Sequence, residues 1–104
     1  MTRFVVYSPR ARQHLTDLYS WIAAESGFPD RAEEYVSAIF DYCDSLVEFP
    51  FVGAARDDLG PGIRTIGFRR RAVIAFAVTD ARVEMLGVYY GGRDYETLLL
   101  TDAD

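Results

Sequence analysis

The sequence predicts an α+β domain in which a helical hairpin packs on one face of a small, mainly antiparallel sheet, in the order β-α-α-β-β-β. Three observations lead to this prediction. The first half of the chain carries two stripes of apolar residues at helical spacing, and the second half carries three short apolar runs. The connections between those runs are too short for crossovers, so the strands must be antiparallel. A length of 104 residues suits one domain, and we expect residues 1–104 to form it.

The first strand and the first helix follow from residue types and spacing. Phe4 to Tyr7 form a short β-prone run. Ser8 is placed to cap a helix, with Pro9 at its first position. Gly27 and the proline that follows it end that helix. Its apolar face consists of Ala11, Leu15, Leu18, Tyr19 and Ile22.

The second helix begins with a capping signal. Asp30, followed three positions later by Glu33, predicts a capping box, and Pro50 stops the helix. The connection between the two helices is so short that they must form an antiparallel hairpin. We expect residues 51–62 to form a loop because they are rich in glycine and aspartate. The apolar face of the second helix consists of Ala32, Tyr35, Val36, Ile39, Phe40, Cys43, Leu46 and Val47.

Three strands are expected at 63–68, 71–79 and 82–90. Side chains alternate between the two faces of a strand, so the even positions share one face and the odd positions share the other. The even positions are bulky and suit packing under the helices: Ile66, Phe68, Ile74, Phe76, Val78, Leu86 and Val88. The odd positions form a second face that is apolar but mostly small: Ile63, Thr65, Gly67, Val73, Ala75, Ala77, Val83, Met85 and Gly87, fringed by Arg69 and Tyr89.

The second face needs a cover of its own. The middle strand, "AVIAFAV", is apolar on both sides, which is typical of a strand that is buried on both sides. One helical hairpin covers only one face, and a trough of small residues would accept an amphipathic helix from a partner polypeptide. Two alternatives stay open. The C-terminal tail, "TLLLTDAD", could fold back over this face, or the protein could self-associate through it.

Charge and cysteine content exclude several classes of protein. The net charge of −5 argues against a general DNA-coating protein, although residues 63–79 hold four arginines and no acid. No apolar stretch is long enough to cross a bilayer and no secretory leader is evident, so we expect a cytoplasmic protein that binds no membrane. Cys43 is the only cysteine, which excludes an internal disulfide and disfavours a cysteine-based metal site. We expect no cofactor and no metal.

Several segments together resemble the RelE/ParE family of toxins from type II toxin–antitoxin systems, and the ParE branch in particular. They are "YSPRARQHLTDLYSWIA", "LVEFPFVG", "GPGIR", "FRRRAVIAFAV" and "LGVYYGGRDYE", which span nearly the whole chain in the family's order. The resemblance implies the β-α-α-β-β-β fold and a small cognate ParD-like antitoxin, bound in a hetero-oligomer. For the ParE branch it implies inhibition of DNA gyrase, and for the RelE branch cleavage of mRNA on the ribosome.

Residue chemistry favours a protein-binding toxin over a nuclease. Metal-free RNA cleavage needs a base, an acid and cations around the phosphate. The chain has arginines but no lysine, and its one histidine, His14, is remote in sequence from the strand ends. Tyr90 with Glu96 is the one acid–base pair that can be suggested. We therefore assign no catalytic residue and expect no direct binding of nucleic acid. The alternatives are a RelE-like ribosome-dependent endonuclease and a family member that binds its antitoxin but poisons nothing.

Two binding surfaces follow from the second face and the resemblance. The small residues and their fringe are the expected antitoxin site: Thr65, Gly67, Arg69, Val73, Ala75, Ala77, Val83 and Met85. The arginine turn and the end of the last strand carry residue types that dominate protein interfaces. They are the expected target-binding site for gyrase: Arg69, Arg70, Arg71, Tyr89, Tyr90 and Arg93.

Overall fold

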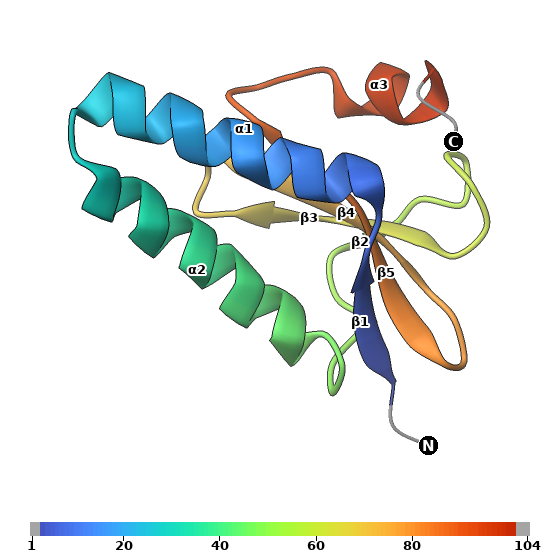
Figure 1. The fold of residues 1–104 in the computed structure, drawn as a ribbon. Coiled ribbons are helices and arrows are strands. Elements are labelled where there is room, and N and C mark those ends of the chain that lie inside the picture. Colours follow the sequence, from blue (N-terminus) through green and yellow to red (C-terminus); the bar gives the residue numbers. More distant parts are fainter. Residues whose placement is uncertain (1–2, 102–104) are drawn as a thin grey trace.

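The computed structural model describes residues 3–101, with the backbone alone at position 101. It confirms the α+β class and the predicted order, and adds a short strand and a short helix (Figure 1). The added strand, β2, lies within the expected loop, and the added helix, α3, follows the last strand. The elements are β1 (Phe4–Tyr7), α1 (Pro9–Ser26), α2 (Pro29–Ser45), β2 (Ala54–Ala55), β3 (Ile63–Phe68), β4 (Ala72–Val78), β5 (Arg82–Tyr90) and α3 (Tyr95–Thr101).

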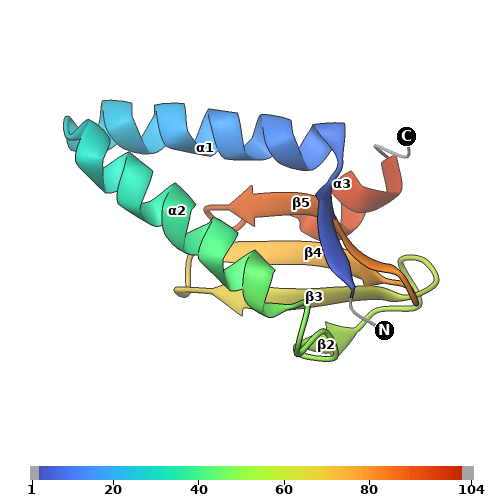
Figure 2. The same ribbon diagram turned by 60° about the horizontal axis from the view of Figure 1, so that its bottom comes forward.

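The sheet has the strand order β1-β5-β4-β3-β2. Strands β3, β4 and β5 form the predicted antiparallel meander, and β1 joins the edge of β5 in parallel. Parallel strands need a long connection. Here the whole helical hairpin lies between β1 and the meander, and it returns the chain to the end of the sheet at which β1 begins. In Figure 2, α2 lies in front of the sheet, α1 runs along its β5 edge, and α3 lies behind it.

The start of α1 agrees with the sequence, and the start of α2 does not. The Oγ of Ser8 accepts a hydrogen bond from the backbone N–H of Ala11 at 3.0 Å, as a cap residue should. The predicted capping box at Asp30 is wrong. Helix α2 begins at Pro29, and its cap residue is the extended Phe28, two residues before Asp30, which makes no side-chain bond. Proline suits this place because its fixed φ is helical and its missing N–H has no partner there.

A bulge in β5 reverses the expected alternation over the first half of that strand. Ala75 lies opposite Gly87, but its neighbour Phe76 lies opposite Met85, so β5 has one extra residue there. Val83 and Met85 consequently point toward the helices, where both are buried. Their expected place on the second face was therefore wrong.

One hydrophobic core fills the space between the helices and the sheet. The helices contribute residues from the apolar stripes that the sequence predicted, and all three strands of the meander contribute from one face. The buried cluster consists of Ala11, Leu15, Leu18, Ile39, Cys43, Leu46, Phe68, Ala72, Ile74, Phe76, Val83, Met85 and Val88. Within residues 3–101, no helix is long and apolar enough to span a bilayer.

Candidate functional site

The second face of the sheet, which is turned away from α2, carries most of the small residues predicted there. Strand pairing sets Thr65, Ala75 and Gly87 side by side across its centre. Without the two residues that the bulge displaces, the predicted members of this face are Ile63, Thr65, Gly67, Val73, Ala75, Ala77, Gly87 and Tyr89, and the bulge adds Glu84, which pairs with Ala77.

The chain itself closes the centre of the second face. The ring of Tyr89 folds back over its neighbour on the strand, since a Cβ atom at Gly87 would lie 2.7 Å from the Tyr89 hydroxyl oxygen. The ring of Tyr95, in α3, follows at a centroid distance of 6.2 Å from that of Tyr89. Ala75 is consequently 0% exposed and Tyr89 2%. Only the margin stays open, where Gly67 is exposed.

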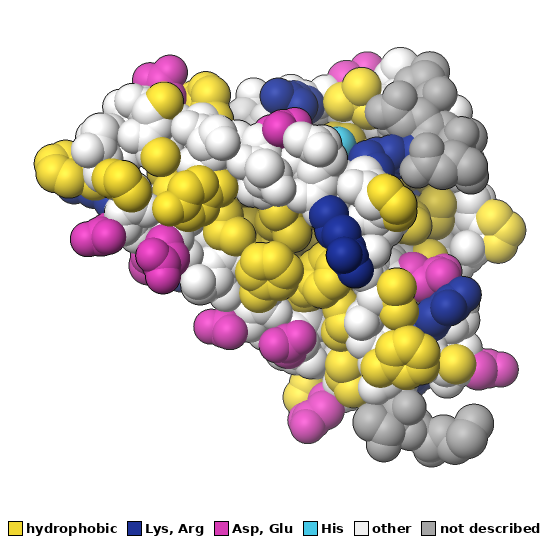
Figure 3. Space-filling model, in the orientation of Figure 1, with side chains coloured by type: hydrophobic (Ala, Val, Ile, Leu, Met, Phe, Trp, Pro, Cys, Tyr) yellow, Lys and Arg dark blue, Asp and Glu magenta, His cyan; other side chains and the backbone are white. Residues whose placement is uncertain are grey.

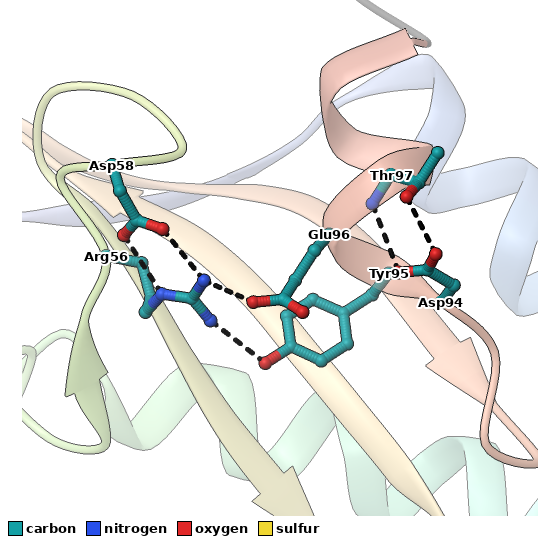
Figure 4. A network of polar contacts seen from close by, with 6 residues as sticks. All are labelled: Arg56, Asp58, Asp94, Tyr95, Glu96 and Thr97. Carbon is teal, nitrogen blue, oxygen red and sulfur yellow. Dashed lines mark hydrogen bonds and ion pairs between the residues drawn. The ribbon is translucent and has the colours of Figure 1, made fainter.

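Helix α3 is fastened over this face by Arg56, which follows β2 (Figure 4). Its Nη1 donates to the hydroxyl oxygen of Tyr95 at 3.1 Å, and its Nη2 pairs with the carboxylate of Glu96. The same guanidinium donates to Asp58 through Nε at 3.0 Å and Nη2 at 2.9 Å. These hydrogen bonds lower the pKa of Asp58 and raise the pKa of Arg56.

The C-terminal alternative raised by the sequence is therefore realised over residues 95–101. Residues 102–104 of the tail lie outside the described residues. A wholly bare second face was expected, and the structure corrects that expectation. The reason is physical: the strand end turns back through Gly91 and Gly92, both with left-handed φ of 75° and 77°. That turn lets the following helix lie on the second face.

The arginine turn between β3 and β4 has an unusual backbone. Arg69 and Arg70 adopt positive φ of 48° and 65° at the two central positions of a β-turn, where asparagine and glycine are preferred, and the N–H of Arg71 closes this turn by donating to the carbonyl oxygen of Phe68 at 3.2 Å. Nη1 of Arg69 donates to both carboxylate oxygens of Glu34 at 3.0 and 3.1 Å. Arg69 also lies over the rings of Tyr35 and Phe68. Arg69 thus fastens the turn to α2, while Arg70 is exposed.

The structure brings part of the predicted target-binding set together. The N–H of Gly91 donates to the carbonyl oxygen of Arg71 at 3.0 Å, so the arginine turn lies beside the end of β5. Tyr90 points to the helix side, with its ring 5.2 Å from that of Trp21. Tyr89, its neighbour in sequence, lies on the second face. Arg71 and Tyr90 therefore share one end of the molecule, and Tyr89 serves to cover the sheet.

A cleft of about 490 Å³ lies where α1 passes the end of β5. Helix α1 contributes His14, Asp17, Leu18 and Trp21, which occur three or four residues apart and so share one face of the helix. The strand end and the turn after it contribute Val88, Tyr90, Gly91 and Arg93. The cleft thus combines two aromatic rings, a carboxylate, an imidazole and a guanidinium.

His14 has a structural part in this cleft that the sequence did not reveal. Its Nδ1 accepts the backbone N–H of Val88 at 3.1 Å, at the edge of β5 beyond the end of β1. The neutral ring therefore carries its hydrogen on Nε2. Its ring also contacts that of Tyr89 at 4.9 Å. His14 is remote in sequence from the strand ends, but the fold brings it beside the end of β5. The sequence offered one signal for this contact, which is that His14 lies beside the apolar stripe of α1.

The acid–base pair suggested for a nuclease is not assembled. Tyr90 lies on the helix side of the sheet and packs against the core, whereas Glu96 lies on the opposite side, paired with Arg56. Within residues 3–101, no group of three or more histidine, cysteine, aspartate or glutamate side chains is arranged to hold a metal ion.

A second concave surface lies between the two long helices, away from the sheet. Figure 3 shows hydrophobic side chains along the seam between α1 and α2. This helix groove has a volume of about 390 Å³ and is lined by Arg12, Leu15, Thr16, Tyr19, Ser20, Val36 and Phe40. Tyr19 and Phe40 are both exposed, which is unusual for large apolar side chains set this close together.

Comparisons with known proteins agree with the fold. The structure is similar to a solved chain described as belonging to the chromosomal ParDE toxin–antitoxin system from P. aeruginosa, with a TM-score of 0.72 and 22% identity. The match covers 88% of this chain and 97% of that chain. No curated protein matches the sequence. Residues 5–95 match the family described as the ParE toxin of the type II toxin–antitoxin system parDE. The chain therefore belongs to the ParE toxin family.

Proposed function

We propose that this toxin inhibits DNA gyrase by binding it, and that a ParD-like antitoxin holds it inactive in a hetero-oligomer in the cytoplasm. The observation that carries the proposal is the match to the ParE family over residues 5–95. In this reading the protein is a binder and not an enzyme. Its chemistry lies in two surfaces, one for the target and one for the antitoxin.

The proposed target surface is the arginine turn together with the end of β5. Arg70, Arg71 and Arg93 are exposed there, near the ring of Tyr90. Arg70 favours this interpretation because its backbone is left-handed, a conformation that costs arginine energy and persists where the surroundings require it. We propose that Arg69 and Tyr89 contribute by positioning: Arg69 holds the turn against Glu34, and Tyr89 supports α3.

The proposed antitoxin surface has two parts. The first is the margin of the second face, where Gly67 is exposed and Val73 and Ala77 are half-buried. Thr65 and Ala75 lie beneath Tyr89 and α3, so they would meet an antitoxin only after α3 moves. The second part is the helix groove, because an amphipathic helix presents side chains at the spacing that such a groove accepts. Tyr19 and Phe40 are the proposed anchors there.

Inhibition of gyrase is tested with the purified toxin in a DNA supercoiling assay, beside a ribosome-dependent mRNA cleavage assay. We expect inhibition of supercoiling and no mRNA cleavage. Arg70→Gln and Arg93→Gln should each weaken inhibition by about tenfold, the cost of removing one interface anchor. Arg82→Gln is the matched control, because Arg82 begins the strand that Tyr90 ends, about 27 Å away. Cleavage of mRNA with normal supercoiling would instead assign the RelE-like activity.

Neutralisation is tested in cells that carry the cognate antitoxin. Phe40→Glu puts a charge into the helix groove and leaves the proposed target surface intact. We expect cells to survive the unmodified toxin and to stop growing with the variant. If cells grow with the unmodified toxin and also with the Phe40→Glu variant, the helix groove is excluded from the antitoxin site. Ala75→Glu is unsuitable for this purpose, because Ala75 is fully buried and a charge there would unfold the sheet.

A further inference from the structure

The cleft between α1 and the end of β5 has features of a ligand site that binding to a protein target does not require. Its walls are Trp21, with an indole that is 49% exposed, and Tyr90, whose ring is tilted by 59° to that of Trp21. A large aromatic ring that stays exposed beside a concave surface is available for stacking. A planar ring system is the ligand feature that such a wall recognises.

The charged groups of the cleft come from both of its walls, α1 and the turn after β5. Asp17 lies one helical turn before Trp21 on the same face of α1. Its Oδ1 accepts a hydrogen bond from Gln13 at 2.8 Å, which orients the carboxylate and leaves acceptor capacity on both oxygens. Arg93 lies on the turn after β5 and is exposed. The cleft therefore offers an acceptor for N–H groups and a cation for an anion, near one stacking surface.

We infer that this cleft binds an unpaired guanine nucleotide. The base stacks on Trp21, its N1–H and N2–H groups donate to the carboxylate of Asp17, and its phosphate pairs with Arg93. Guanine is the base whose edge presents two neighbouring donors, which match the two oxygens of a carboxylate. A volume of about 490 Å³ is within the range of small-ligand sites. The net charge of −5 does not oppose this, since one phosphate needs one cation and not a basic surface.

The chain supplies its own reporter for the experiment. Trp21 is the only tryptophan, so all tryptophan emission of the protein comes from a wall of this cleft. Titration of the full-length protein with guanosine monophosphate should quench the emission saturably, with half-saturation below about 1 mM. Inosine monophosphate lacks the N2 amine and should bind more weakly, and adenosine monophosphate more weakly still. Guanosine, which has no phosphate to pair with Arg93, should bind more weakly than guanosine monophosphate.

Matched variants test the assigned contacts. Asp17→Asn should remove the preference for guanine over adenine, and Arg93→Gln should weaken guanosine monophosphate by at least about fivefold without affecting guanosine. Glu33→Gln and Arg82→Gln change exposed charges outside the cleft. They should alter neither the preference for guanine over adenine nor the affinity for guanosine monophosphate. Quenching that does not saturate would overturn the proposal. Equal affinity for all three nucleotides, or an unchanged affinity in both cleft variants, would overturn it as well.

The source of the nucleotide is decided by a further arm. A single-stranded oligonucleotide with a 5′-phosphorylated guanosine should compete with guanosine monophosphate for the cleft. Affinity higher by about tenfold or more points to the end of a nucleic acid strand, and equal affinity points to the free nucleotide. Either outcome supports the site. Because no gyrase is present in these titrations, their result is independent of the proposed inhibition.

Discussion

The two faces of the sheet are closed in different ways. The face under α1 and α2 is closed by a continuous cluster of buried apolar side chains from both helices and the meander. The second face carries small residues and is closed at its centre by Tyr89, Tyr95 and the short helix α3. From outside, Arg56 holds that helix through its hydrogen bond to Tyr95 and its ion pair with Glu96.

The difference indicates which part of the molecule can move. Burial of apolar surface is the main source of stability, so opening the first face means unfolding. The hydrogen bond and ion pair that Arg56 makes to α3 are partly exposed, and such contacts contribute little individually, so we expect α3 to leave the second face while the rest stays folded. An antitoxin that competes with α3 would then gain the small-residue surface beneath it.

Truncating the centre of the first face should have the largest effect. Phe76 is fully buried beneath the helices, so Phe76→Ala should lower the free energy of unfolding by about 3–5 kcal/mol, through lost burial and a cavity. Val73→Ala, on the half-buried margin of the second face, should cost less than about 1.5 kcal/mol. Urea denaturation measures both. Equal losses in the free energy of unfolding would mean that the two faces contribute equally to stability.

High pH should weaken the first face through Cys43. Burial raises the pKa of its thiol from 9.0 to about 11. A group with a raised pKa stabilises the fold fully below its unfolded value, and this contribution disappears as pH rises through the folded value. Stability should therefore fall between pH 9 and 11, by about 3 kcal/mol in all.

Thermal melting across this pH range is the measurement, with Cys43→Ala as the comparison. The variant starts less stable because it leaves a small cavity, but it should lose less with rising pH. Burial also raises the pKa of Tyr7, so some alkaline loss should remain in the variant. Parallel pH profiles for the two proteins would show that the thiol does not contribute.

The sequence predicted the first face better than the second. Apolar spacing identified both helices, the meander and most of the core, because burial on one side imposes a strict period. The extra residue in β5 broke that period without a local signal, so Val83 and Met85 were assigned to the wrong face. Helix α3 was missed because its three leucines also suit a strand or a free tail. The cleft was missed because the residues of its two walls are far apart in sequence, as Asp17 and Arg93 are.

Filling the space under Tyr89 should disturb the second face alone. In Gly87→Ala the new methyl group would lie within 2.8 Å of ring carbons of Tyr89, so the ring must move away. We expect a loss of about 1 kcal/mol. Gly67→Ala is the matched control on the same face, because its added Cβ would meet no atom within 4 Å. The NMR signals of Tyr89 and Tyr95 should shift in the first variant only. Unshifted signals in both would place the rings elsewhere.

Releasing α3 should have the smallest effect on global stability and is the sharpest test of the comparison. Arg56→Ala removes the hydrogen bonds to Tyr95, Glu96 and Asp58 without touching the core. We expect an unchanged denaturation midpoint, together with faster amide hydrogen exchange in residues 95–101. Arg82→Ala, which removes another exposed ion pair, should leave that exchange unchanged.

Acid should reproduce the release of α3. The pKa of Asp58 is lowered by Arg56, and that of Asp94 is lowered by its hydrogen bonds from Thr97 at the start of α3. A lowered pKa stabilises the fold above its unfolded value, here 3.8, and the contribution is lost as pH falls through the folded value. Below about pH 4 the α3 amides should therefore lose protection, measured as their exchange rate relative to that of an unfolded chain at the same pH, while the core amides stay protected. If α3 and the core instead open together, the second face is part of the same cooperative unit, and an antitoxin could reach it only by unfolding the toxin.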